Sequence, residues 1–134
     1  MGKLVVDTNA LLQSIASRNK YHDLWISLFD GRNNLCITNE ILQEYEEVLE
    51  LRISKDFAKR IIEKILYNDN TLLFDPYFKF NLIQADPDDN KFVDCAVCAN
   101  AKFIVTEDKH FQILKNIEFP KVDIITLDEI IQII

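Results

Sequence analysis

The sequence predicts an α/β fold in which helices cover both faces of a parallel sheet. Short apolar runs rich in β-branched residues recur along the chain, and they alternate with stretches of helical periodicity. In a chain of 134 residues that is 49% hydrophobic, this alternation is typical of parallel strands that are buried on both sides. A chain of this size can bury one core, so we expect residues 1–134 to form a single domain.

The expected elements follow the chain in order. The strands are predicted at 4–6, 35–37, 72–74, 103–105 and 122–125. The helices are predicted at about 9–17, 22–30, 40–51, 56–67, 90–101, 109–115 and 127–133. The last helix opens with Thr126 and Glu129, which have the spacing of a capping box. Residues 75–89 contain two of the three prolines and are expected to form a long, irregular connection.

Composition excludes several classes of function. The chain has only two glycines, so it cannot build the glycine-rich phosphate loops of Walker-type ATPases or dinucleotide-binding enzymes. Its three cysteines come with no secretory features, and we expect them to be reduced thiols in the core. The formal net charge of −7 argues against nucleic-acid binding by bulk electrostatics, so any nucleic acid must be bound locally.

No segment of the sequence is typical of a membrane protein or of a secreted one. The N-terminal residues run directly into Asp7 without a long apolar stretch. Nowhere does the chain hold the roughly 18 uninterrupted apolar residues of a membrane span. We therefore expect a cytoplasmic protein with no membrane partner.

Carboxylates follow two of the predicted strands. Asp7 comes directly after the first strand, and Asp108 lies two residues beyond Thr106, which ends the fourth. The carboxyl ends of parallel strands meet at one edge of a sheet, where ligands bind in this architecture. Two acids at that edge favour a shared site, although Asp7 alone would serve equally well as a helix N-cap. Glu107 competes with Asp108 for the second position.

Asp94 lies within a predicted helix that is apolar nearly all round. A buried, unpaired carboxylate costs several kcal/mol, so it needs a metal ion, a cationic side chain or a proton as partner. The alternative to a metal is a salt bridge to a nearby lysine or arginine. Just before this helix, residues 86–89 bring three more acids, which would also suit simple capping of its N-terminal turn.

Glu44 lies on the predicted helix 40–51, beside its apolar stripe. At about 100° per residue, Glu44 and Glu46 flank this stripe on opposite sides. Leu51 widens the stripe on the Glu44 side, so Glu44 is expected to be the more enclosed acid. Gathered carboxylates repel one another, and hard oxygen ligands are those that Mg²⁺ or Mn²⁺ prefers. Such an ion would lower the pKa of bound water and support attack on a phosphodiester.

Four segments together resemble PIN-domain proteins, in particular the branch that contains toxin components of toxin–antitoxin systems. They are Val5–Leu12, Thr38–Tyr45, Asp86–Phe92 and Phe103–Asp108, and the resemblance covers nearly the whole chain. It implies a three-layer sandwich around a five-stranded parallel sheet, and Mg²⁺- or Mn²⁺-dependent cleavage of RNA. It also implies an RNA substrate and an antitoxin protein as partners, with a homodimer as a further assembly to consider.

The resemblance also assigns roles to single residues. It makes Asp7, Glu44, Asp94 and Asp108 the catalytic, metal-binding acids, with Thr8, Asn9, Asn90 and Thr106 in support. One position departs from the pattern: many PIN proteins carry their third acid about eighteen residues before the last, where this chain has Asn90. That role must then fall to Asp94, which we favour because of its expected burial, or to Asp89.

A basic rim near the acids is expected to contact the RNA. The candidates closest in sequence are Lys91, Lys102, Lys109, His110 and Lys115. An alternative function is a PIN fold with weak or lost catalysis that binds a protein or an RNA, and the acidic pI and Asn90 favour it. A receiver domain would need adjacent acids after the first strand, and an Asp-x-Asp phosphatase would need an acid at Asn9.

Overall fold

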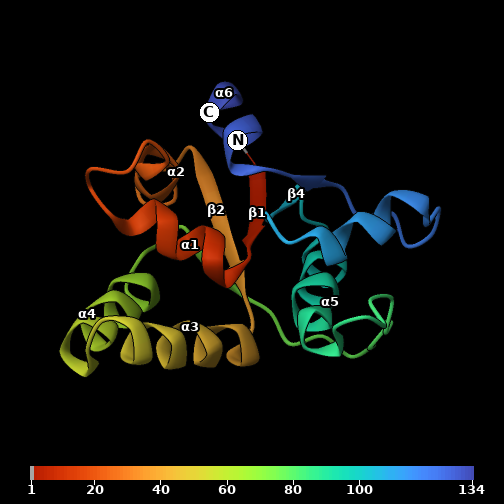
Figure 1. The fold of residues 1–134 in the computed structure, drawn as a ribbon, viewed down its shortest axis with the longest axis horizontal. Helices are drawn as coiled ribbons and strands as arrows, with labels where there is room; N and C mark the ends of the chain where they lie inside the picture. The colour runs from red at the N-terminus through yellow and green to blue at the C-terminus, as the bar shows by residue number, and fades with distance from the viewer. Residues whose placement is uncertain (1) are drawn as a thin grey trace.

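The computed structural model describes residues 2–134, which contain five strands in one parallel sheet (Figure 1). The strand order is β3-β2-β1-β4-β5. The strands are β1 (Gly2–Val6), β2 (Asn33–Ile37), β3 (Thr71–Leu73), β4 (Phe103–Val105) and β5 (Ile124–Ile125). All five predicted strands are present, and the predicted α/β architecture is confirmed.

The helices lie where the periodicity predicted them, within a few residues. In Figure 1, α1 and α2 lie to the left of β1, and α5 lies to its right, where it contacts β1, β2 and β4. The helix α3 packs along α4 as a hairpin. The bounds are α1 (Thr8–Ile15), α2 (His22–Ser27), α3 (Asn39–Arg52), α4 (Lys55–Leu66), α5 (Asn90–Ala99) and α6 (Leu127–Ile133). The segment predicted as a helix at 109–115 is a 3₁₀ helix, η2 (Lys109–Asn116).

Side-chain caps begin several of these helices. Thr38 accepts a hydrogen bond from the backbone N–H of Ile41 at the start of α3, and Ser54 does the same for Phe57 in α4. At α6 the predicted capping box of Thr126 and Glu129 forms in both directions. The local sequence signals therefore set these helix starts.

The register of the sheet brings the ends of β1 and β4 side by side. Val6 pairs with Val105, and the backbone N–H of Asp7 donates to the Val105 carbonyl at 3.0 Å. Asp7 and Thr106 are therefore neighbours at the carboxyl edge of the sheet. Tyr45 reinforces this edge from α3, because its buried hydroxyl donates to the Val6 carbonyl.

The connection from β3 to α5 contains no helix or strand between Phe74 and Asp86, as its prolines predicted. Two side chains of α5 hold it. The Asn90 amide accepts from the Ile83 N–H and donates to the Ile83 carbonyl, both at 2.9 Å. The Asp94 carboxylate accepts from the Phe80 N–H at 3.1 Å. The connection ends in a short 3₁₀ helix, η1 (Pro87–Asp89).

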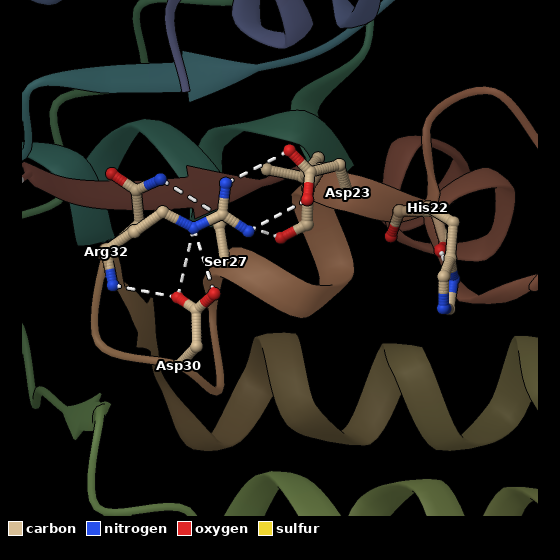
Figure 2. A network of polar contacts seen from close by, with 8 residues as sticks. His22, Asp23, Ser27, Asp30 and Arg32 are labelled. Carbon is tan, nitrogen blue, oxygen red and sulfur yellow. Dashed lines mark hydrogen bonds and ion pairs between the residues drawn. The ribbon is translucent and has the colours of Figure 1, made fainter.

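The turn between α2 and β2 is fixed by a polar network (Figure 2). Figure 2 shows the guanidinium of Arg32 reaching two carboxylates, with nitrogen–oxygen distances of 2.8 Å to Asp23 and 2.9 Å to Asp30. Beside it, the Asn33 amide donates to the Ser27 hydroxyl at 3.1 Å. This network lies away from the carboxyl edge and stabilises the turn into β2.

The cysteines and the lengths of the helices test two further predictions made from the sequence. Cys36 and Cys95 are buried free thiols, as expected, but Cys98 is exposed, so the core prediction was wrong for this one residue. It was wrong because α5 is not covered on the side that Cys98 presents. Within residues 2–134, none of the helices is both long and apolar enough to cross a membrane.

Candidate metal centre

Asp7 is positioned by β1 and held by Thr106. The Thr106 hydroxyl donates to Asp7 Oδ2 at 2.8 Å and accepts from the backbone N–H of Asp108 at 3.0 Å. Asp7 occupies the N-cap position of α1, but its side chain makes no capping hydrogen bond. The Asp7 carboxylate therefore contacts Thr106 and does not cap α1, although its position in the sequence allowed a cap.

Burial changes the acid strength of Asp7. The residue is 6% exposed, and desolvation raises its pKa to about 6, against the hydrogen bond from Thr106. The negative charges of Asp108 and Glu44 raise the pKa further. The three acids therefore share one electrostatic environment at the carboxyl edge.

Asp89 joins this cluster from the end of η1. The residue is 9% exposed, and burial raises its pKa to about 7, with further contributions from the charges of Asp108, Asp86 and Asp7. Its Oδ2 atom is buried and has no hydrogen-bond partner among residues 2–134. An unpaired buried oxygen of this kind costs free energy unless a cation or a proton meets it.

Asp94 lies elsewhere. Burial is the largest influence on the pKa of Asp94 and raises it. The charged side chains that act on this pKa are Lys79 and Glu40. It lines a small cavity of about 90 Å³ together with Thr38, Glu40 and Lys79. The structure thus brings Asp7, Asp89 and Asp108 together, whereas Asp94 lines another cavity, which Lys91 also lines. The Asp94 carboxylate accepts from the Phe80 N–H there.

Asn90 does not face the acids either. Both ends of its amide are used by the Ile83 backbone. Its supporting role is therefore to fix the connection that leads into Asp86 and η1. The position that departs from the PIN pattern serves the fold, and the preceding residue, Asp89, carries the carboxylate of the cluster.

Glu44 reaches the cluster from α3 but is already paired. It accepts from the Thr8 hydroxyl, and its other oxygen lies 2.7 Å from the Lys91 ammonium. The Lys91 side chain is only 11% exposed and also contacts Asp88 at 2.8 Å. Burial lowers the pKa of Lys91, but the hydrogen bonds to Asp88 and Glu44 outweigh it and raise the pKa above its usual value. Lys91 is thus an internal cation of the site.

The other predicted basic residues are spread over the molecule. Lys102 donates its backbone N–H to the Lys3 carbonyl, which places it at the amino end of the sheet, away from Asp7. Lys109 and Lys115 are exposed on η2, and Lys115 lies near Glu129 of α6. His110 lies directly at the acids, with Nδ1 3.2 Å from Asp108 Oδ1.

A cleft opens beside Asp7 and Asp108. Its volume is about 580 Å³, and it is lined by Asp7, Asn9, Leu12, Gln13, Arg52, Glu107 and Asp108. Asn9 is exposed here, and Glu107 accepts from the Leu127 N–H at 3.2 Å, so it supports α6. Arg52 comes from the last turn of α3 and was not predicted from the sequence, because nothing near it in the chain belongs to the acid motifs.

A PIN-domain family model matches residues 3–110. The chain belongs to the PIN-domain family. The match includes each segment of the predicted motif, from Asp7 to Asp108. No curated protein matches the chain.

Solved structures share this PIN-domain fold at low sequence identity. VapBC2 from Rickettsia felis, bound to a DNA fragment from its promoter, matches with a TM-score of 0.65 at 16% identity, over 92% of this chain and 98% of that one. DNA-bound VapBC from Salmonella typhimurium gives 0.65 at 17% identity, over 95% and 99%. VapBC-1 from nontypeable Haemophilus influenzae gives 0.63 at 16%, over 95% and 99%. These likenesses concern the fold.

The donor set at the edge of this PIN domain suits a divalent cation. Asp86, Asp89, Asp108 and His110 each offer one ligand atom, and these atoms all lie within 4.8 Å of one another. The buried, unpartnered Oδ2 of Asp89 is the strongest observation, because a positive charge there would satisfy it. Asp86 was noticed in the sequence only as a helix-capping acid, and its proximity to Asp108 is a tertiary effect.

Proposed function

We propose that this PIN domain is a divalent-metal-dependent endoribonuclease and the toxin component of a toxin–antitoxin system. The observation that carries the proposal is the buried, unpartnered carboxylate oxygen of Asp89 in a cluster with Asp7 and Asp108. Such a cluster is costly without a cation. Family membership supports the nuclease activity, and the VapBC complexes among the structural neighbours support an antitoxin partner.

Asp7, Asp89 and Asp108 would hold the ion, which we propose to be Mg²⁺ or Mn²⁺. When bound, the ion supplies Lewis acidity, a lowered pKa for bound water and charge stabilisation at the phosphate. The chain orients the acids: Thr106 fixes Asp7, and the backbone N–H of His110 fixes Asp108 Oδ1 at 2.9 Å. Beside them, Glu44 is held in an ion pair with the Lys91 ammonium at 2.7 Å.

Substrate RNA would lie in the cleft beside the acids. Asn9 and Gln13 present amide groups there, and Arg52 presents the guanidinium that suits a phosphate. Because the net charge of the protein is −7, binding of a polyanion needs local positive charge, and Arg52 supplies such a charge in the cleft. Of the predicted basic residues, Lys109 is exposed next to Asp108 and remains a candidate, whereas Lys91 is enclosed.

The activity is tested with purified protein and RNA, with and without divalent ions. We expect cleavage with Mg²⁺ or Mn²⁺ and none in EDTA. Asp7→Asn and Asp108→Asn should each lower the rate at least about a hundredfold, because each removes a ligand charge and keeps the volume. Glu46→Gln on the exposed side of α3 is the matched control. Equal cleavage in EDTA would rule out the metal mechanism.

One observation favours a second function, a catalytically weak PIN fold that binds a protein or an RNA. The Lys91 ammonium forms an ion pair with Glu44, which leaves fewer carboxylates available to bind a metal ion. If the purified protein binds RNA but releases no product with any divalent ion, this function replaces the first. The toxin assignment has its own test: expression should arrest bacterial growth, and Asp108→Asn should not.

The cleft assignment is tested by charge reversal. Arg52→Glu should weaken RNA binding and flatten its salt dependence, because one phosphate contact is lost. Arg18→Glu is the control, since Arg18 is exposed beyond the far end of α1 and outside the cleft. Equal effects of the two variants would place the RNA elsewhere.

A further inference from the structure

His110 presents its imidazole to three carboxylates. Its Nδ1 atom lies 3.2 Å from Asp108 Oδ1, 3.7 Å from Asp89 Oδ2 and 3.9 Å from Asp86 Oδ2. These groups come from η1 and its cap on one side and from the start of η2 on the other. A nitrogen donor therefore completes a set of oxygen donors.

The backbone fixes this arrangement. Asp108 caps η2 by accepting the His110 N–H at 2.9 Å, and Asp86 caps η1 by accepting the Asp88 N–H at 3.3 Å. Each cap uses only one carboxylate oxygen, Oδ1 in both cases. The Asp86 Oδ2 atom is left to face His110. The acids are thus held in place by the same bonds that begin the two 3₁₀ helices.

Two atoms of the cluster lack partners. Within the part of the chain that the structure describes, the buried atoms Asp89 Oδ2 and His110 Nδ1 make no hydrogen bond, although they lie 3.7 Å apart. A hydrogen bond between these two atoms would satisfy both, but 3.7 Å is too long for a hydrogen bond. A cation of ordinary size between them would contact both, since metal–oxygen and metal–nitrogen bonds are about 2.0–2.2 Å long.

We infer that His110 and Asp86 are further ligands of the divalent ion, in addition to the acids already assigned to it, and that His110 makes the site prefer Mn²⁺ over Mg²⁺. The inference rests on the proposed metal-dependent function and names the selectivity of its site. Mg²⁺ favours all-oxygen surroundings and keeps its waters, whereas imidazole nitrogen is a good ligand for first-row transition ions. A mixed donor set of this kind therefore discriminates between the two.

The test is a binding measurement that needs no RNA. Mn²⁺ is titrated into metal-free protein and followed by electron paramagnetic resonance, with pulsed detection of nitrogen coupled to the ion. The chain has only two histidines, so the signal is assigned with His110→Ala. His22→Gln is the matched control, because His22 Nδ1 contacts the Ser14 carbonyl and lies outside the cluster. Mg²⁺ affinity is measured by competition.

We expect nitrogen coupling in the wild-type protein and in His22→Gln, and its loss in His110→Ala. Mn²⁺ affinity should fall about 10- to 100-fold in His110→Ala, with a much smaller change for Mg²⁺. Asp86→Asn should weaken both ions, since it removes an oxygen ligand's charge. The folded state of each variant is checked by its thermal melting curve.

Three outcomes separate the hypotheses. If Mn²⁺ binds without nitrogen coupling and His110→Ala keeps the selectivity, His110 is not a ligand, even if RNA is cleaved. If the coupling is present but no RNA is cleaved, the site stands and the nuclease proposal fails. If His110→Ala destabilises the metal-free protein and leaves Mn²⁺ binding intact, His110 is an imidazolium that pairs with the acids, and the inference is wrong.

Discussion

At the scale of single residues, the identity of the third acid is the main question that the structure bears on. Asp89 and Asp94 are five positions apart, and at 3.6 residues per turn they point to different sides of α5 and its cap. Asp89 shares its electrostatic environment with Asp7 and Asp108, and Asp94 shares its own with Lys79 and Glu40. We therefore move the proposed third ligand from Asp94 to Asp89.

Variants of Asp89 and Asp94 should differ in how much a metal ion stabilises the folded protein. Asp89→Asn should stabilise the metal-free protein near pH 8, because it removes a buried charge, and it should shrink the rise in melting temperature caused by Mn²⁺. Asp94→Asn should leave that rise unchanged, since its oxygen can still accept from Phe80. Melting curves with EDTA and with Mn²⁺ measure both. A smaller Mn²⁺ effect in Asp94→Asn alone would restore Asp94 as the ligand.

The pH dependence of stability follows from the same acids. In the folded protein the pKa values of Asp7 and Asp89 are raised to about 6 and about 7, from 3.8. Between these limits the folded state binds more protons than the unfolded state, so the free energy of unfolding falls as pH rises. The contribution of these groups is most favourable below pH 4 and is lost by pH 7 to 8.

Urea denaturation in EDTA from pH 4 to 8 measures this slope. Above pH 5, the fall in the free energy of unfolding with rising pH should be smaller in Asp89→Asn than in the wild-type protein. The difference should be roughly 1–3 kcal/mol between pH 5 and pH 8. Saturating Mn²⁺ should reverse the trend, because the ion binds the ionised acids. Stability that is independent of pH in EDTA would show that the acids do not share a buried site.

At the scale of elements, α5 organises the connection that precedes it. Asn90 pairs with both backbone groups of Ile83, and Asp94 holds the Phe80 N–H. These bonds give the irregular segment before η1 a defined path, and η1 carries Asp86 and Asp89 to the site. The helix thus positions the acids through its N-terminal turn and its loop contacts.

Restoring an acid at position 90 should therefore not improve the site. Asn90→Asp removes the donor to the Ile83 carbonyl and brings a charge into a buried position, which should cost about 1–3 kcal/mol. Metal affinity should not rise. Asn116→Asp, at the exposed end of η2, is the control with the same chemical change. Tighter Mn²⁺ binding in Asn90→Asp would mean that this side chain can turn toward the acids.

At the scale of the whole molecule, the proposed ion connects segments that are far apart in the chain. Asp7 follows the central strand β1, Asp86 and Asp89 flank η1, and Asp108 begins η2 after β4. The parallel sheet brings them to one edge. The unfolded chain has no such cluster, so binding of the ion is linked to folding.

Divalent ions should therefore raise the stability of the whole domain. At about a hundred times the dissociation constant, the gain is about 2.7 kcal/mol, or very roughly 5–10 °C in melting temperature. Differential scanning calorimetry with increasing Mn²⁺ measures it. Asp108→Asn should reduce the shift, and Arg32, whose ion pairs lie at the α2–β2 turn, offers a control in Arg32→Lys. An unchanged melting temperature would argue against a preformed ion site.

The sequence by itself determined the succession of strands and helices along the chain, the capping box of Thr126 and Glu129, and the placing of Asp7 and Asp108 at one edge. These features depend on local patterns of apolar residues and on short-range hydrogen bonds, which are read along the chain. It also predicted that Glu44 would be enclosed, which the structure bears out by pairing it with Thr8 and Lys91.

Only the tertiary structure decided which acids lie together and which cations lie beside them. Asp89 and Asp94 look alike in the sequence, and His110, Lys91 and Arg52 were at best nearby basic residues or were unnoticed. Their roles depend on the direction of each side chain and on groups that are distant in the chain, such as Glu44 for Lys91 and Asp89 for His110. Burial then sets the free-energy cost of each charge, and burial exists only once the chain is folded.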